Sequence, residues 1–388
     1  MRILHVIPSL NPAGGGPIEA VTRLGMEYRR QGSDVQVLTL DDPRSEWLKD
    51  FPLPCYAIGP AFLKYGYTRR LVPWLRKHAS EFDLVVVNGV WQYTSFAVWR
   101  ALRDTKTPYV VFTHGMLDPW FKRQYPLKHL KKWLYWPWAE YRVLRDATAV
   151  LFTAEEERRL ARRSFWLYRC NEVVINYGTA APPADDGSSA DRFRRAFPSV
   201  GDKRIILFLG RIHEKKGCQL LIRAFGSMLR DSPEAWRSWH LVFVGPDSSV
   251  AYRRSLDRLI SKTCPEGSIT WTGLLTGDLK WAAFRAADVF ALTSHQENFG
   301  IAVAEALGCG LPVLLSNQVN IWREIEEDRA GFVENDDEAG ARALLQRWMA
   351  LDDAARDVMR ANASRCFLAR FDVRHTSVRL AATLEAIA

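Results

Sequence analysis

The fold is decided by residues 2–40, RILHVIPSLNPAGGGPIEAVTRLGMEYRRQGSDVQVLTL, because four segments of different character follow one another there. ILHVI (Ile3–Ile7) is a short apolar run bounded by turn-forming residues, which is typical of a buried parallel strand. NPAGGGP (Asn11–Pro17) is a glycine loop, and apolar residues recur at helical spacing in Ile18–Arg30. VQVLTL (Val35–Leu40) is the next strand, so the stretch predicts a βαβ unit with a glycine loop after its first strand.

Apolar strand patterns continue through both halves of the chain. In the first half they fall at residues 84–87, 109–113, 148–152 and 173–175. TAAPPADDGSSAD (Thr179–Asp191) then has the composition of an exposed interdomain linker. The pattern restarts at residues 205–210, 240–245, 269–273, 288–294 and 312–316. The sequence therefore predicts an α/β protein with two doubly wound, Rossmann-like parallel-sheet domains that face each other across a cleft.

The composition is that of a large globular protein. The 388 residues are 48% hydrophobic and 25% charged, which excludes disordered, collagen-like and disulfide-scaffold chains. The formal net charge of +9 indicates an acidic or phosphorylated partner. No run of 18 apolar residues exists, so no segment is expected to span a bilayer. Six scattered cysteines and a start without a secretory signal predict reduced, mostly buried thiols and a cytoplasmic location.

A basic turn follows the first strand of the second half. GRIHEKKG (Gly210–Gly217) has glycines at both ends, and a helix is expected directly after it. Arg211 offers a two-pronged guanidinium and Lys216 a point charge, and both suit a diphosphate. The alternative is an ordinary basic surface turn.

A second motif lies in SHQENFGIAVAEALGCGLPVL (Ser294–Leu314), where a loop ends at Gly300 and a helix follows to about residue 308. The first-turn N–H groups of this helix, around residues 299–302, form an anion or hydroxyl site. Glu297 precedes the helix and Glu305 lies two turns further on, so the pair suits sugar hydroxyls. The alternative is two solvated or capping glutamates, and a hydrolase acid/base pair is disfavoured by the two intervening turns.

Two further features follow strands of the first half. The triple glycine Gly14–Gly16 lets the backbone approach a ligand closely, although it is neither a dinucleotide fingerprint nor a P-loop and could be a flexible turn. His114 stands directly after a strand, where it suits a substrate hydroxyl or a structural role. Ligands of open α/β sheets bind at the carboxyl ends of the strands, so we expect these motifs to line the cleft.

A basic and aromatic segment stands apart from these motifs. Residues 119–170 contain 12 Lys and Arg against 5 Asp and Glu, and the aromatic residues gather in residues 119–145. In PLKHLKKWLYWPWAEY (Pro126–Tyr141), a helix is expected to start at Pro126 and to be interrupted by Pro137. Its apolar side chains share one helical face beside three lysines: Leu127, Leu130, Leu134, Trp138 and Tyr141, with Lys128, Lys131 and Lys132. The segment suits an anionic membrane surface, a nucleic-acid groove or a core-packed helix with a cationic edge.

Taken together, these motifs resemble the family-four retaining glycosyltransferases of bacterial polysaccharide and lipopolysaccharide assembly, which have the GT-B fold. The resemblance rests on AGGG, His114, NYG (Asn176–Gly178), G-R-x4-K-G (Gly210–Gly217) and E-N-F-G-x4-E (Glu297–Glu305), and it covers essentially the whole chain. INYGT departs from the Pro-Asn-Gly-Val type of sequence that the family often has there. The resemblance implies an acceptor-binding domain, residues 1–180 with a returning helix at about 371–388, and a nucleotide-sugar-binding domain, residues 190–370.

The resemblance also implies roles for single residues. Arg211 and Lys216 would neutralise the nucleotide diphosphate as it leaves, Glu297 would grip the donor sugar, and His114 would contact that sugar. Similar enzymes need no metal or other cofactor. The donor-binding residues that it implies are Gly15, Gly16, Gly210, Leu274, Asn298, Phe299, Gly300, Ile301 and Glu305.

The sequence thus predicts a retaining hexosyltransferase that moves a hexose from a nucleotide sugar to a saccharide or a lipid-linked saccharide. We expect it in the cytoplasm or peripherally on the inner face of the cell membrane, with an anionic membrane surface, but no nucleic acid, as a partner. The alternatives are a GT-B enzyme of another activity, such as an epimerase, and a sugar-binding protein without catalysis. The base, the hexose, the acceptor and the oligomeric state are not identified by the sequence.

Overall fold

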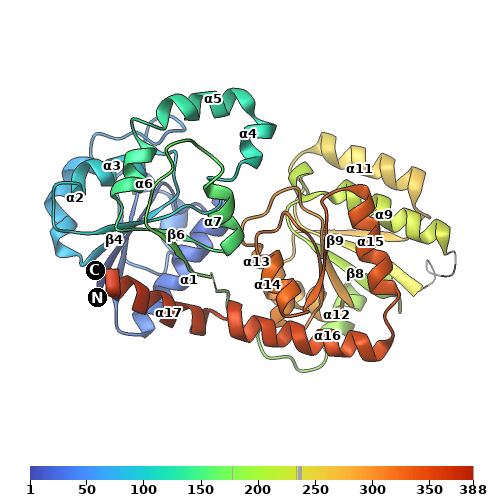
Figure 1. The fold of residues 1–388 in the computed structure, drawn as a ribbon. Coiled ribbons are helices and arrows are strands. Elements are labelled where there is room, and N and C mark those ends of the chain that lie inside the picture. The colour runs from blue at the N-terminus through green and yellow to red at the C-terminus, as the bar shows by residue number, and fades with distance from the viewer. Residues whose placement is uncertain (177, 233, 235–237, 388) are drawn as a thin grey trace. The chain divides into compact units, whose positions relative to one another are not determined.

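The apolar runs of the sequence form the strands of two parallel sheets. The computed structural model describes residues 1–176, 178–232, 234 and 238–387. They divide into two compact units, Met1–Gly178 with Val373–Ala388 and Thr179–Asp372 (Figure 1). Each unit contains one of the sheets, so the doubly wound α/β fold predicted from the sequence is confirmed.

Unit 1 contains a seven-stranded parallel sheet in the order β3-β2-β1-β4-β5-β6-β7. Its strands are β1 (Arg2–Ile7), β2 (Asp34–Thr39), β3 (Cys55–Ala57), β4 (Leu84–Asn88), β5 (Tyr109–Phe112), β6 (Ala149–Phe152) and β7 (Glu172–Val174). Its helices are α1 (Gly16–Arg30), α2 (Leu71–His78), α3 (Tyr93–Leu102), α4 (Trp120–Gln124), α5 (Pro126–Tyr135), α6 (Glu140–Asp146), α7 (Glu155–Ala161) and α17 (Val373–Ile387). The central strands β4, β5 and β6 are buried along their whole length, which explains their continuous apolar runs.

Unit 2 contains a six-stranded parallel sheet in the order β10-β9-β8-β11-β12-β13. Its strands are β8 (Arg204–Leu209), β9 (Trp239–Val244), β10 (Ile269–Gly273), β11 (Val289–Leu292), β12 (Val313–Ser316) and β13 (Gly331–Glu334). Its helices include α8 (Ser189–Ala196), α9 (Cys218–Asp231), α11 (Val250–Thr263), α12 (Gly277–Ala286), α13 (Ile301–Gly308), α14 (Trp322–Glu327), α15 (Glu338–Met349) and α16 (Asp353–Cys366). The order of strands reverses between β8 and β11, and ligands of such sheets bind at this switch point.

The last helix of the chain belongs to unit 1. The helix α17 packs against α1, and the Gln31 side-chain amide donates to Ser377 Oγ over 2.9 Å. A Cβ at Gly178 would overlap Thr376 Oγ1 and the backbone of Val373, so the glycine of the NYG motif permits this close approach. Tyr177 of the same motif lies outside the described residues.

One expectation, on the cysteines, needs correction, and one of the three alternatives for the basic and aromatic segment does not hold. Of the six cysteines, which are all free, only Cys218 and Cys366 are buried, so the thiols are not mostly buried. The leucine face of α5 does not pack into the core, because Leu127 is 78% exposed and Leu134 is 64% exposed. In the part of the chain that the structure describes, no helix is both long and apolar enough to cross a membrane.

Candidate functional site

The basic motif Gly210–Gly217 leaves β8 at its carboxyl end and closes as a 3-10 turn over Glu214–Lys216. Gly217 ends this turn in the left-handed region, with φ 63°. A Cβ there would overlap the carbonyl oxygen of Thr293 at the end of β11, while Thr293 Oγ1 donates to the Gly217 carbonyl over 3.0 Å. Only glycine fits this position, and the close approach fixes the basic turn against the neighbouring strand.

The second motif is held against the first by backbone hydrogen bonds. The His295 N–H donates to the Lys215 carbonyl over 2.8 Å, which ties the loop after β11 to the basic turn. The Glu297 N–H donates to the Gln318 carbonyl over 2.9 Å, and the Asn320 N–H donates to the Glu297 carbonyl over 3.0 Å. The backbone of Glu297 is therefore clamped to the loop after β12, and its side chain is directed from a rigid segment.

Lys216 and Glu297 meet in this switch point as an ion pair, with both side chains 19% exposed. Burial, followed by the positive charges of Lys215 and Arg211, lowers the pKa of Lys216 to about 7. Arg211 is exposed beside them, and no carboxylate among the described residues forms an ion pair with it. The two cations predicted from the sequence thus share one site with Glu297, where an anionic ligand would stabilise the charged form of Lys216.

The helix α13 begins directly after this pair. Gly300 is its N-cap in the left-handed region, and the first intrahelical N–H donors to Gly300 come from Val303 and Ala304. The N–H groups of Ile301 and Ala302 lie in the first turn, where no carbonyl of the helix is placed to accept a hydrogen bond from them. The anion or hydroxyl site predicted from the sequence stays a prediction at these two groups, while Phe299 packs edge-on against Phe371.

Glu305 lies further along α13 and is almost fully buried. Its Oε1 accepts a hydrogen bond from Lys280 Nζ over 2.6 Å, so a lysine of α12 holds this carboxylate. Sequence reasoning missed Lys280, since an isolated lysine in a helical pattern carries no signal for a partner 25 residues away. Leu274, the residue after β10, is two-thirds exposed.

The remaining predicted residues belong to unit 1. Gly15 and Gly16 form the turn that starts α1, and Gly15 has φ 77° with open space where a Cβ would stand. His114 also has positive φ, and its Nε2 donates to Asn88 Oδ1 over 3.3 Å. Burial, followed by the nearby His5, lowers the pKa of His114 to about 3. His114 is therefore neutral near pH 7.

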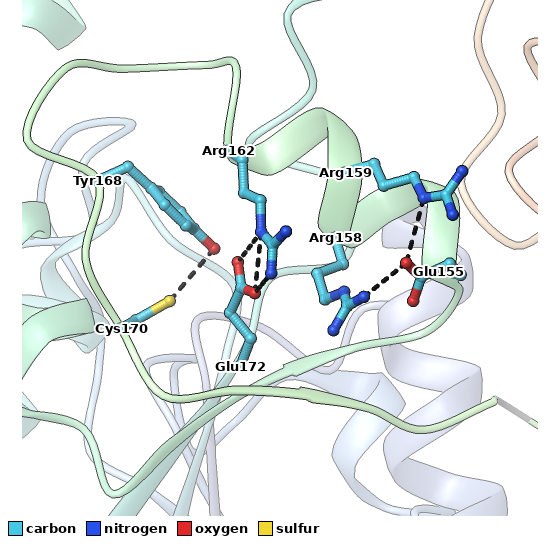
Figure 2. Close-up of polar contacts among 7 residues, drawn as sticks. All are labelled: Glu155, Arg158, Arg159, Arg162, Tyr168, Cys170 and Glu172. Carbon is cyan, nitrogen blue, oxygen red and sulfur yellow. Dashed lines mark hydrogen bonds and ion pairs between the residues drawn. The ribbon is translucent and has the colours of Figure 1, made fainter.

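A buried carboxylate holds the loop that carries His114. Glu157, in the first turn of α7, accepts from Thr113 Oγ1 and the Gly115 N–H over 2.5 Å each, and from the N–H and Oγ1 of Thr153 over 2.7 Å each. Its neighbour Glu155 instead forms partly exposed ion pairs with Arg158 and Arg159 (Figure 2). The run of three glutamates was visible in the sequence, but nothing in it indicated which one is buried.

Comparison with known proteins bears on the same residues. The model of the glycosyl transferases group 1 matches residues 189–365, and that of the glycosyl transferase 4-like domain matches residues 15–178. The chain belongs to the family-four type of glycosyltransferases with the GT-B fold. Both candidate motifs of unit 2 lie inside the first match, and Gly15, Gly16 and His114 lie inside the second.

Individual relatives of this glycosyltransferase differ in how much of the chain they cover. A D-inositol 3-phosphate glycosyltransferase of Kineococcus radiotolerans is 31% identical over 50% of this chain, and the match spans only 45% of that relative's length. A GDP-mannose:cellobiosyl-diphosphopolyprenol alpha-mannosyltransferase of Xanthomonas campestris is 24% identical over 97% of this chain and 94% of its own. The crystal structure of HepE from Anabaena in complex with UDP covers both chains completely with a TM-score of 0.78 at 20% identity, which supports the fold.

Proposed function

We propose that this glycosyltransferase moves a hexose, with retention of configuration, from a nucleoside-diphosphate sugar to a lipid-linked saccharide in surface polysaccharide or glycolipid assembly. The observation that carries the proposal is the Lys216–Glu297 pair beside Arg211 at the switch point of unit 2. Two cations at one strand end suit a diphosphate, and the carboxylate beside them suits the sugar that the diphosphate carries.

In the proposed reaction, the bond between the anomeric carbon and the β-phosphate oxygen breaks. The acceptor hydroxyl forms the new bond on the same face of the sugar, and its proton passes to the departing phosphate. Arg211 and Lys216 neutralise the charge that develops on the leaving diphosphate, a role in which one preorganised donor contributes about 3 kcal/mol. No metal is needed in this scheme, because the two cations supply that stabilisation.

The other site residues bind the donor in this proposal. The first-turn amides of α13 and Glu297 bind the sugar hydroxyls, and Glu305, held by Lys280, binds the ribose. His114, which is neutral near pH 7, contacts the donor sugar, and the open turn at Gly15 and Gly16 bounds the diphosphate. The relative from Xanthomonas campestris is named for GDP-mannose, whereas the HepE structure is a complex with UDP, so the base is left to experiment.

Thermal stabilisation by GDP, UDP and ADP and by their sugar conjugates tests the donor site. Arg211→Ala and Lys216→Ala are expected to abolish most of the shift that the preferred nucleotide gives to the wild-type protein. Lys262→Ala is the matched control, because Lys262 is an exposed lysine of α11 in the same unit. Wild-type nucleotide affinity in both site variants would show that the diphosphate binds elsewhere.

The stereochemistry and the metal requirement are tested on the product. With the preferred donor and a short diphosphate-linked acceptor, the proton NMR coupling of the new anomeric centre is expected to match that of the donor sugar. Transfer is expected to continue after exhaustive chelation with EDTA. An inverted product or a rate abolished by EDTA and restored by Mg²⁺ would refute the respective part of the proposal.

We also propose that α5 rests on an anionic membrane surface. Its outward face presents Leu127, Leu130 and Leu134 to solvent, and Lys131 is exposed beside them. Exposed leucines with a neighbouring cation are complementary to acyl chains and acidic headgroups, and each such lysine contributes about 1 kcal/mol to binding. Vesicles of acidic phospholipid are expected to pellet the protein at low salt, and Lys131→Glu is expected to weaken pelleting about fivefold. Protein that stays in solution with these vesicles would exclude this partner.

A further inference from the structure

A second cationic pocket lies in unit 1, under α5. It offers about 50 Å³, the room of three or four water molecules or of one phosphoryl group. The pocket is formed where the loop after β5 meets α4, α5 and the segment Ser164–Phe165. Its lining residues with an acidic or basic side chain are Asp118, Lys122, Lys128, His129 and Lys132.

The three lysines of this pocket lack carboxylate partners. Among the residues that the structure describes, no ion pair within 4.0 Å involves Lys122, Lys128 or Lys132. Two of them rest on aromatic faces instead: Lys128 Nζ lies 4.6 Å from the centre of the Tyr125 ring, and Lys132 Nζ lies 4.6 Å from that of Trp91. A cation on an aromatic face keeps its N–H donors available for a further ligand.

Lys132 is the most enclosed of the three. Burial lowers the pKa of its ammonium to about 8, although the carboxylate of Glu140 partly opposes this. Glu140 does not contact Lys132 as an ion pair: its Oε1 accepts from the Trp91 N–H over 2.7 Å and from Ser95 Oγ over 2.8 Å, and its Oε2 is buried without a hydrogen-bond partner. An enclosed cation without a contacting counterion is stabilised by an anion that enters the pocket.

The surroundings of the pocket suit an anion attached to a hydrocarbon. Phe121, Phe165 and Met116 form apolar walls, and α5, which covers the pocket, presents leucines on its opposite face. Met116 and Asp118 follow His114 within four residues on the same loop, so the pocket belongs to the same strand end as this candidate catalytic residue.

From these observations we infer that the pocket binds a phosphoryl group at the junction between the lipid and the saccharide of the acceptor. The inference rests on the proposed function and adds the chemical class of the acceptor, a phosphate or diphosphate ester of an amphiphile. The phosphoryl oxygens accept from the three lysines, and the hydrocarbon runs along the apolar walls. An anionic phospholipid headgroup presents the same chemistry, so the test separates the two sources.

Binding is measured first, with farnesyl phosphate as the probe and isothermal titration as the readout. Lys132→Gln is expected to weaken binding at least tenfold, whereas Lys77→Gln, an exposed lysine of α2 in the same unit and outside the pocket, leaves it unchanged. Arg211→Ala with Lys216→Ala is also expected to leave it unchanged, because those residues belong to unit 2. Equal loss in Lys77→Gln and Lys132→Gln, or loss only in the unit 2 variant, would overturn the inference. The titration needs no turnover, so it distinguishes a failed pocket from a failed transferase.

Kinetics then separate the sources of the phosphate. The same saccharide is offered as a short-chain diphosphate ester and as a neutral alkyl glycoside. Lys132→Gln is expected to raise KM about tenfold for the diphosphate ester alone, with KM for the nucleotide sugar and the thermal midpoint unchanged. If Lys132→Gln instead weakens binding to acidic vesicles and leaves KM for the diphosphate ester unchanged, the pocket holds a phospholipid headgroup and the assignment to the acceptor is wrong.

Discussion

At the scale of single residues, the burial of Lys216 makes the protonation of its amine depend on pH near neutrality. Its pKa of about 7 means that its ammonium is lost as the pH rises through neutrality. A bound diphosphate favours the charged form of Lys216, so above pH 7 this side chain takes up a proton when the diphosphate binds. The Kd of the diphosphate therefore rises by up to about tenfold per pH unit in that range. Below pH 7 the amine is already charged in the free protein, so this contribution to Kd is flat. Isothermal titration with the preferred nucleoside diphosphate, in buffers of different ionisation enthalpy between pH 6 and 9, counts the protons.

The matched variant for this prediction is Lys216→Arg. A guanidinium stays charged throughout this pH range, so the rise of Kd that Lys216 causes is expected to disappear. A slope that persists in Lys216→Arg would assign the titration to another group.

The buried Glu157 leads to a prediction on the His114 loop. Its two oxygens accept four hydrogen bonds, and an amide at this position would place an NH2 group against two of those donors. Glu157→Gln is therefore expected to destabilise the fold by about 2–4 kcal/mol and to lower kcat, since unpaired buried donors are costly. Urea unfolding and initial rates with the preferred donor measure the two effects.

Glu155 provides the control on the same helical turn. Its ion pairs with Arg158 and Arg159 are partly exposed, so Glu155→Gln is expected to cost less than about 1 kcal/mol (Figure 2). Similar losses in the two variants would mean that Glu157 has no special role in fixing the loop.

At the scale of elements, α5 differs from an ordinary surface helix in the face that it exposes to solvent. Its leucines face solvent, while Lys128 and Lys132 line a pocket on its inner side. Leu130→Gln with Leu134→Gln is therefore expected to change the free energy of unfolding by less than about 0.5 kcal/mol, where core leucines would cost 2–5 kcal/mol each. The same variant is expected to lose most of its binding to acidic vesicles. Urea unfolding measures the first effect and vesicle pelleting the second. A decrease of several kcal/mol in the free energy of unfolding would show that the leucines pack in the core.

The helices and strands also show what the sequence could predict. Central strands such as β4 and β5 were found because a strand buried on both faces is a continuous apolar run. The edge strands β3 and β13 were missed, because neither is a continuous buried run: no residue of β3 is fully buried, and buried and partly buried residues alternate in the short β13. For α5, periodicity identified the apolar face but did not show whether this face is buried or exposed. That depends on which surfaces the rest of unit 1 covers.

The candidate site was predictable to a similar degree. Arg211, Lys216 and Glu297 stood out because each follows a strand whose carboxyl end lies at the switch point of the sheet. Lys280, Glu157 and the pocket under α5 could not be predicted. Each depends on a contact between segments that are distant in sequence. Lys280 and Glu157 carry no motif of their own, and the basic segment 126–141 stood out without indicating that two of its lysines line a pocket.

At the scale of the whole molecule, one glycine determines how the end of the chain returns to unit 1. A Cβ at Gly178 would overlap both Thr376 Oγ1 and the backbone of Val373 at the start of α17. Gly178→Ala is expected to cost about 1–3 kcal/mol, because the helix must shift to make room. The expected signature is faster hydrogen–deuterium exchange in α17 and α1, with α9 and α13 of unit 2 unchanged.

The double variant Gly178→Ala with Thr376→Ala sharpens this prediction. Removing the Thr376 hydroxyl relieves one overlap, but the backbone of Val373 cannot be trimmed, so exchange in α17 is expected to remain fast. The nucleotide-dependent thermal shift should persist in both variants, since Arg211, Lys216 and Glu297 all belong to unit 2. Wild-type exchange in α17 of Gly178→Ala would show that the helix does not depend on this close approach, and loss of the nucleotide shift would show that the donor site depends on α17.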